Sequence, residues 1–109
     1  MRAMASTGVL LVFCTFPSRG KARQIGTLLV EKQLAACVNL SAEVTSIYRW
    51  RGEVCEESEV QGVFKVIEGR YEEFAAHLEE LHPYEVPEIV AVPVLAGSEK
   101  YLKWVRQNA

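Results

Sequence analysis

Two side chains in this chain have the chemistry of soft-metal ligands, Cys14 and His82. Cys14 lies in the apolar run "VLLVFCTF" of residues 9–16, and His82 lies in "LHPYEVPEIVAVPV" of residues 81–94. Thiolate and imidazole suit copper and zinc. A closed site normally has four protein donors, so two residues do not complete one. A second hypothesis stays open, in which Cys14 belongs to the core and charged His82 interacts with the last carbonyl groups of a helix.

Carboxylates offer a second kind of chemistry. Glu56, Glu57 and Glu59 lie close together in the sequence. They could form a catalytic carboxylate pair or the solvated face of a strand, and we favour the solvated face. Lys65 interrupts an otherwise apolar strand pattern. Its side chain either extends its charged end to solvent or pairs with an acid across a subunit boundary. Glu57 and Glu88 are the candidate partners.

Enzyme chemistry finds little support in the sequence. The segment "FPSRGKA" of residues 16–22 imitates a phosphate loop through Arg19 and Lys21, but Gly20 is its only glycine. Neither GxxxxGK nor GxGxxG is present. No Ser-His-Asp set is evident around the two histidines, and no third group accompanies Cys14. We therefore expect that the protein is not an enzyme.

Length and charge narrow the classes further. A chain of 109 residues provides for one domain, and we expect a loose lead-in over residues 1–8 and a single domain over residues 9–109. The net charge is −2 and no basic stripe is present, so nucleic acid is not an expected partner. The early apolar stretch of residues 9–13 is far too short to span a bilayer, and we expect no membrane or targeting segment.

The cysteines bear on compartment and packing. Their odd number and the absence of CxxC do not predict a disulfide framework or a zinc ribbon. We therefore expect a reducing compartment, the cytoplasm. Cys14 and Cys37 lie in apolar runs and are expected in the core, whereas Cys55 follows a turn beside carboxylates.

The elements that must position these residues follow from hydrophobic periodicity. The pattern predicts strands over residues 9–16, 34–50, 54–68 and 88–95, the middle two joined by a turn at residues 51–53. Helical spacing predicts helices over residues 19–33 and 71–81, and Gly97 and Ser98 open a short terminal helix. Pro93 in the last strand indicates an edge position or a bulge.

This order predicts an α+β fold of the ferredoxin-like split βαβ (βαββαβ) type, with a long β-hairpin and an added C-terminal helix. Each hairpin arm has roughly 15 residues, or about 50 Å, whereas the two helices cover roughly 20 Å. The distal hairpin, with Ile47, Tyr48 and Trp50, therefore lacks a helix beneath it. A lone two-stranded ribbon is marginal in water, so we expect another subunit to cover it.

Four segments carry a family resemblance. "LVEKQLAACVNL", "TSIYRWRGEV", "LHPYEVPEIVAVPV" and "YLKW" occur in this order and closely resemble the CutA divalent-cation-tolerance family, over about residues 9–105. The resemblance implies a homotrimer related in architecture to the PII signal-transduction proteins. In such a trimer, the long hairpins extend around the three-fold axis and pair with neighbouring subunits.

The resemblance also implies site residues. The family takes its name from copper tolerance, and its metal-binding picture places ligands for copper or another divalent cation at Cys14 and His82. A relative with two adjacent histidines before "PY" would have the first at Leu81, so this chain has one donor fewer. The implied intersubunit clefts include Tyr48, Trp50, Lys65, His82 and Glu88, to which we add Glu57 as a partner of Lys65.

We therefore expect a trimer involved in metal-ion tolerance or response that binds metal ions or a small ligand in its clefts. The alternative is a structural or signalling trimer that anchors a partner protein. In that case metal binding would be adventitious.

Overall fold

The computed structural model describes residues 7–109, which form a four-stranded sheet flanked by three α-helices. No helix in this part of the chain is both long and apolar enough to cross a membrane. The elements are β1 (Val9–Phe16), α1 (Arg19–Glu31), β2 (Cys37–Trp50), β3 (Glu53–Ile67), a 3-10 turn (Glu68–Arg70), α2 (Tyr71–Leu81), β4 (Val90–Pro93) and α3 (Glu99–Asn108).

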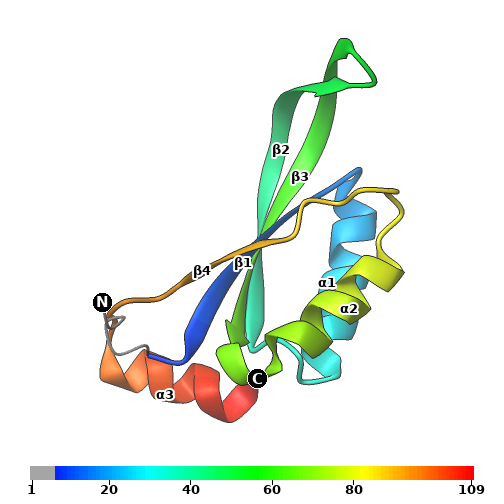
Figure 1. Ribbon diagram of the computed structural model, residues 1–109. Helices are drawn as coiled ribbons and strands as arrows, with labels where there is room; N and C mark the ends of the chain where they lie inside the picture. Colours follow the sequence, from blue (N-terminus) through cyan, green and yellow to red (C-terminus); the bar gives the residue numbers. More distant parts are fainter. Residues whose placement is uncertain (1–6) are drawn as a thin grey trace.

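The sheet has the strand order β2-β3-β1-β4, and each neighbouring pair is antiparallel. Helices α1 and α2 lie together on one face of this sheet (Figure 1). This is the predicted ferredoxin-like arrangement, with α3 added after the last strand. Pro93 lies in the outermost strand β4, where a missing backbone N–H costs least, as its position in the sequence predicted.

The core lies between the sheet and the two helices α1 and α2. Alternate residues of β1 and β3 point toward the helices because successive side chains of a strand face opposite sides. The rings of Phe64 and Phe74 meet edge to face with centroids 5.1 Å apart. The largest fully buried side chains in this layer are Phe16, Phe64, Phe74, Ile25, Leu29 and Leu78.

The helices begin where the sequence predicted. The Ser18 hydroxyl accepts a hydrogen bond from the Lys21 backbone N–H at 3.1 Å, and the Ser98 hydroxyl accepts one from the Tyr101 N–H at 3.3 Å. Each serine satisfies a backbone donor that the first helical turn leaves without a partner. Through Leu102 and Val105, α3 forms a second small apolar cluster at the end of the sheet.

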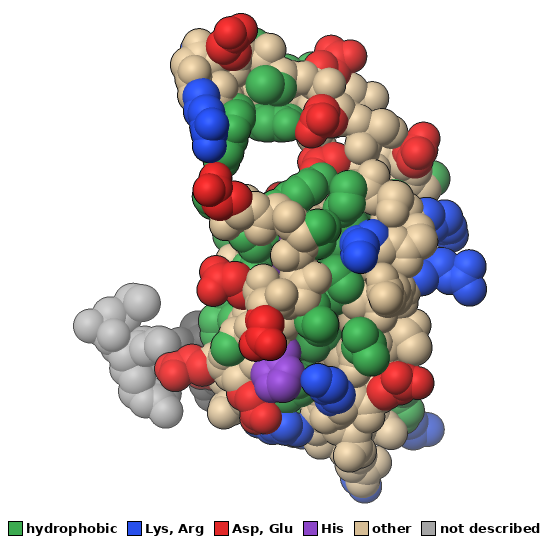
Figure 2. Space-filling model, turned by 90° about the vertical axis from the view of Figure 1, so that its right-hand side faces the viewer, with side chains coloured by type: hydrophobic (Ala, Val, Ile, Leu, Met, Phe, Trp, Pro, Cys, Tyr) green, Lys and Arg blue, Asp and Glu red, His purple; other side chains and the backbone are tan. Residues whose placement is uncertain are grey.

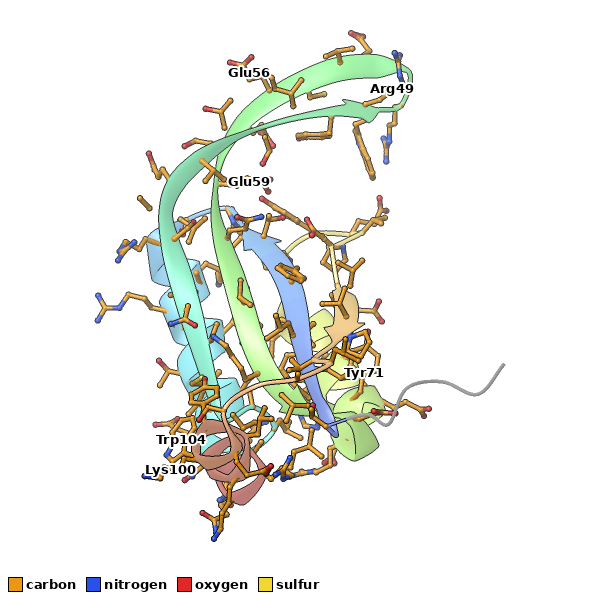
Figure 3. The ribbon with its side chains drawn as sticks, turned by 90° about the vertical axis from the view of Figure 1, so that its left-hand side faces the viewer. Arg49, Glu56, Glu59, Tyr71, Lys100 and Trp104 are labelled. Carbon is orange, nitrogen blue, oxygen red and sulfur yellow. The ribbon has the colours of Figure 1, made fainter. Side chains whose placement is uncertain are left out.

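The hairpin of β2 and β3 extends beyond the rest of the sheet. Pairing of β1 with β3 stops at Phe16 and Val60, so residues 53–59 pair with β2 alone. These residues extend about 23 Å past the end of β1. A register shift between Leu40 and Glu43 interrupts the ladder, and the hairpin curls over on one side (Figure 3). The predicted overhang is therefore present.

Several predicted boundaries were wrong. Thr7, in the predicted lead-in of residues 1–8, is hydrogen-bonded to the domain: its hydroxyl donates to the Val94 carbonyl at 2.7 Å and its own carbonyl accepts from Arg106 Nη1 at 2.8 Å. The remaining lead-in, residues 1–6, lies outside the described residues. Strand β2 begins only at Cys37, because the backbone N–H groups of Leu34 and Ala35 both bond the Leu29 carbonyl of α1.

Turns and strand ends account for the other differences. Arg51 and Gly52 alone form the hairpin turn, both with positive φ (51° and 83°), and Glu53 already belongs to β3. Positive φ at both central residues is the geometry of the tight turns that match strand twist. Strand β4 spans four residues rather than the predicted eight.

Candidate functional site

A hollow of about 780 Å³ lies between the distal hairpin (residues 43–59) and residues 83–88, the segment that joins α2 to β4. We call it the hairpin hollow. Figure 2 shows it as an opening beneath the hairpin tip with acidic side chains around it. The side chains that matter for its chemistry are Tyr48, Trp50, Glu57, Glu59, Tyr84 and Glu88.

Two tyrosine–glutamate hydrogen bonds shape the walls of the hairpin hollow. The Tyr48 hydroxyl donates to Glu57 Oε1 at 2.6 Å, and the Tyr84 hydroxyl donates to Glu59 Oε2 at 2.5 Å. The bond to the Glu57 carboxylate raises the pKa of Tyr48 to about 12. Burial, followed by the bond to Glu59, raises the pKa of Tyr84. Both phenols therefore stay protonated and act as donors at neutral pH.

The second of these bonds ties the loop to the sheet. Tyr84 lies in the segment after α2, whereas Glu59 lies in β3, so their bond fixes the segment against the hairpin. At the rim, Arg51 Nη2 and Glu85 Oε1 approach to 3.6 Å. Both side chains are largely exposed, so this ion pair contributes little.

His82 lies directly behind the hairpin hollow. Its Nδ1 accepts a hydrogen bond from the Tyr84 backbone N–H at 3.1 Å, so Nε2 carries the proton and donates to the Thr15 carbonyl at 2.8 Å. The ring stacks on Phe16 with centroids 5.2 Å apart, and the residue is only 7% exposed. Burial lowers the pKa of His82, although its bond to Thr15 and the charge of Glu59 act in the opposite direction.

This arrangement argues against both hypotheses for His82, metal ligation and a charged ring at the end of a helix. The neutral ring uses both nitrogens in hydrogen bonds, so neither offers a free lone pair to a metal ion. It also does not act as a charged group at a helix end: His82 has extended backbone angles, φ −75° and ψ 138°, and its ring points to β1. The structure assigns the ring a structural role that joins α2, β1 and the following loop.

Cys14 is equally unsuited to ligation. It is fully buried in the core, and burial, followed by the charges of Glu88 and Glu59, raises its thiol pKa to about 12. Metal ligation requires the thiolate. Across residues 7–109, no three His, Cys, Asp or Glu side chains cluster in a way that could hold a metal ion. The geometry therefore does not support a copper site at Cys14 and His82.

The structure brings most of the predicted cleft residues together. Tyr48, Trp50, Glu57 and Glu88 all line the hairpin hollow, although they come from three separate segments. Lys65 does not: within this chain its Nζ donates to Asn39 Oδ1, near the opposite end of the hairpin. Its predicted pairing across a subunit boundary stays a prediction.

Two side chains that line the hairpin hollow, Glu59 and Tyr84, were not predicted as cleft residues. A strand places alternate residues on one face, so Glu57 and Glu59 had to share the concave side of the hairpin. That alternation was the available indication for Glu59. Tyr84 had a weaker one, its place beside His82 in the segment before β4.

Cys37 was wrongly predicted to lie in the core. It is partly exposed at the start of β2, where its Sγ lies 3.6 Å from the Tyr101 hydroxyl of α3. The added helix, and not the core between sheet and helices, is its neighbour. Cys55 is also partly exposed, and its Sγ faces the Glu53 carbonyl at 3.9 Å.

The fold and site together define a ferredoxin-like domain with a curled, overhanging hairpin and an acidic, aromatic hollow beneath it. Residues 10–108 match the model of one such family, the CutA1 divalent ion tolerance protein. This match spans nearly the whole chain, and the chain belongs to the CutA1 family.

Individual relatives agree with this assignment. The divalent-cation tolerance protein CutA of Thermus thermophilus is 46% identical over 98 residues, which cover 90% of this chain and 95% of that protein. The human protein CutA is 43% identical over 99 residues, 91% of this chain, but the chain spans only 55% of its length. The crystal structure of CutA1 from a Shewanella species superposes with a TM-score of 0.91 at 38% identity, covering 96% of this chain and 98% of that one.

Proposed function

We propose that this protein assembles as a homotrimer and takes part in tolerance or response to divalent metal ions. The family name supports the link to divalent ions. The overhanging hairpin supports assembly, because Ile47 is 67% exposed and Trp50 is 41% exposed on a two-stranded ribbon without a helix beneath it. Strand β2 is also an outer strand with a free edge, and such edges pair readily with other chains.

We further propose that the hairpin hollow is the ligand cleft of this trimer. The observation that carries the proposal is the convergence of the hairpin and residues 83–88 on one hollow of about 780 Å³. Small-molecule sites usually have volumes of 300–1,000 Å³. In the assembly, a neighbouring subunit would complete its walls. We propose a binding role and no catalysis, because no cysteine or histidine of the described residues lines the hollow to act as nucleophile or base.

Assembly is tested by light scattering at micromolar concentration. We expect a mass of about three chains of 12.2 kDa, and a monomeric mass would refute the trimer. Trp50→Ala should weaken assembly, with Lys100→Ala on α3 as a control far from the distal hairpin (Figure 3). If Trp50 becomes fully enclosed in the trimer, its truncation costs about 3–5 kcal/mol.

Metal binding is tested separately by titration with copper in both oxidation states. We expect weak, substoichiometric binding, because Cys14 is buried and protonated and His82 uses both ring nitrogens. A stoichiometric, submicromolar site that His82→Ala abolishes would make a direct copper role primary and contradict our interpretation of the ring.

The second candidate function is a structural or signalling trimer that anchors a partner protein. The exposed apolar side chains Val90 and Val92 of the outer strand β4, and Leu95 just after it, favour it. A trimer that binds neither metal nor any small ligand would support this alternative. We also propose the cytoplasm as the compartment, on the basis of the three free cysteines, and cell fractionation would test it.

A further inference from the structure

We propose that the hairpin hollow binds an organic cation, a ligand with one or more ammonium groups, and not a bare metal ion. The inference rests on the proposed role of the hollow as a ligand cleft and names the class of ligand. It is carried by the charge of the lining, by one buried carboxylate and by the aromatic walls.

The lining of the hairpin hollow is strongly acidic. Four carboxylates, Glu57, Glu59, Glu85 and Glu88, line it, and no lysine, arginine or histidine of residues 7–109 does. Arg51 meets Glu85 only at the exposed rim. A concave surface lined by one sign of charge concentrates the electric field and attracts ligands of the opposite sign. The ligand is therefore cationic.

Glu59 shows where the cationic group would bind. The residue is only 8% exposed, yet it lines the hairpin hollow. Tyr84 satisfies one carboxylate oxygen, Oε2, whereas Oε1 has no hydrogen-bond partner among the described residues and is not fully enclosed, so a ligand in the hollow can reach it. A buried carboxylate is costly unless a cation or further donors compensate it. An ammonium group that donates to Oε1 would supply both the charge and the missing hydrogen bond.

The aromatic side chains favour an organic cation over a hydrated ion. Trp50, Tyr48 and Tyr84 line the same hollow, and the faces of such rings attract ammonium and guanidinium groups. The Trp50 ring already has the guanidinium carbon of Arg51 at 5.5 Å from its centroid. A ligand ammonium group would use the same kind of contact deeper in the hollow.

A bare divalent ion fits the hairpin hollow poorly. Magnesium and calcium need about six or more oxygen ligands arranged around one point. Here two of the carboxylates are engaged by tyrosine hydroxyls, and no three ligating side chains cluster within the described residues. The volume is also far larger than a single ion requires. The acidic charge would therefore attract metal ions only diffusely.

The test is calorimetric titration with spermidine as the cationic probe, at about physiological ionic strength so that diffuse attraction is screened. Magnesium chloride is titrated in parallel, and glycerol serves as an uncharged probe. We expect saturable binding of spermidine and no saturable binding of magnesium or glycerol. Glu59→Gln and Trp50→Ala should each weaken it about tenfold or more, because each removes a contact worth one to a few kcal/mol.

Glu56→Gln provides the matched control. This substitution removes the same charge from the same strand as Glu59→Gln. Glu56 points away from the hollow, on the outer side of the hairpin, whereas Glu59 points inward (Figure 3). Equal weakening by Glu56→Gln would mean non-specific attraction and overturn the proposal. So would the absence of saturable spermidine binding, or magnesium binding that is tighter than spermidine binding and lost in Glu59→Gln.

The scattering mass of each variant separates the two proposals. A trimer that does not bind spermidine refutes the organic-cation site and leaves assembly intact. A monomer that binds spermidine refutes the trimer and supports the site. If Glu59→Gln fails to fold, Glu57→Gln is the second variant, since Glu57 is exposed and bonds only Tyr48.

Discussion

His82→Ala should destabilise the fold strongly, although the residue lies at the end of a helix next to a loop. The substitution removes the donor to the Thr15 carbonyl and the acceptor of the Tyr84 N–H, together with the ring stacked on Phe16. Each buried polar group left without a partner costs about 1–3 kcal/mol, and the aromatic contact adds about 0.5–1.5 kcal/mol. We expect a loss of about 3–5 kcal/mol in the free energy of unfolding.

The same ring gives the stability a pH dependence of known sign. Burial holds the pKa of folded His82 below the value of about 6.5 in the unfolded chain. Its contribution is therefore fully present above about pH 6.5. As the pH falls below that value, the unfolded chain takes up the proton first, so the free energy of unfolding decreases until the pH passes the folded pKa.

Guanidinium denaturation at pH 8 and at pH 5.5, at one fixed protein concentration, measures both effects. His82→Asn retains an acceptor near Nδ1, and His82→Gln retains a donor near Nε2, so each should recover part of the loss and neither should show the histidine pH dependence. His77→Gln removes the other histidine, which lies partly exposed on α2, and is the control. A His82→Ala protein within 1 kcal/mol of the wild type would refute the hydrogen-bonded role of the ring.

Three further predictions concern the core and the cysteines. Cys37 and Cys55 should react with a thiol reagent in the native protein before Cys14, whose thiol is buried with a pKa of about 12; mass spectrometry of the labelled peptides would show the order. Phe74→Ala should cost about 3–5 kcal/mol in a denaturant titration, because the ring is fully buried. Gly62→Ala should lower the melting temperature, because its Cβ would lie 3.0 Å from a core phenylalanine ring; an unchanged value would mean that the ring moves aside freely.

The sequence predicted the fold well because the fold depends on periodicity. Strand β1 is apolar on both faces, and α2 carries apolar residues at helical spacing up to Pro83, so both ended where expected. The overhang could be predicted from the lengths of the strands and helices alone, since a hairpin longer than the helices beside it must extend beyond them. Cys37 was misplaced because local apolarity does not show that α3 and Tyr101, far along the chain, lie beside it.

The site was predicted in part, for a related reason. The overhang drew attention to Tyr48 and Trp50, and the family resemblance named them as cleft residues; both line the hairpin hollow. The role of His82 was out of reach of the sequence, because the protonation of its ring depends on two backbone groups, one of them 67 residues away in Thr15. Its residue type and the family resemblance had together made His82 a candidate ligand.

His82 instead positions residues of the hairpin hollow without lining it. The ion pair between Arg51 and Glu85 is exposed and too weak to hold residues 83–88 against the hairpin. Two part-buried hydrogen bonds position Tyr84 instead: its N–H donates to the His82 ring and its hydroxyl donates to Glu59 of the hairpin. Both act on Tyr84, so loss of the His82 ring would free the backbone of the residue whose hydroxyl orients Glu59. The buried carboxylate that we assign to ligand binding is therefore positioned from the core, through His82 and Tyr84, and not from the hairpin alone.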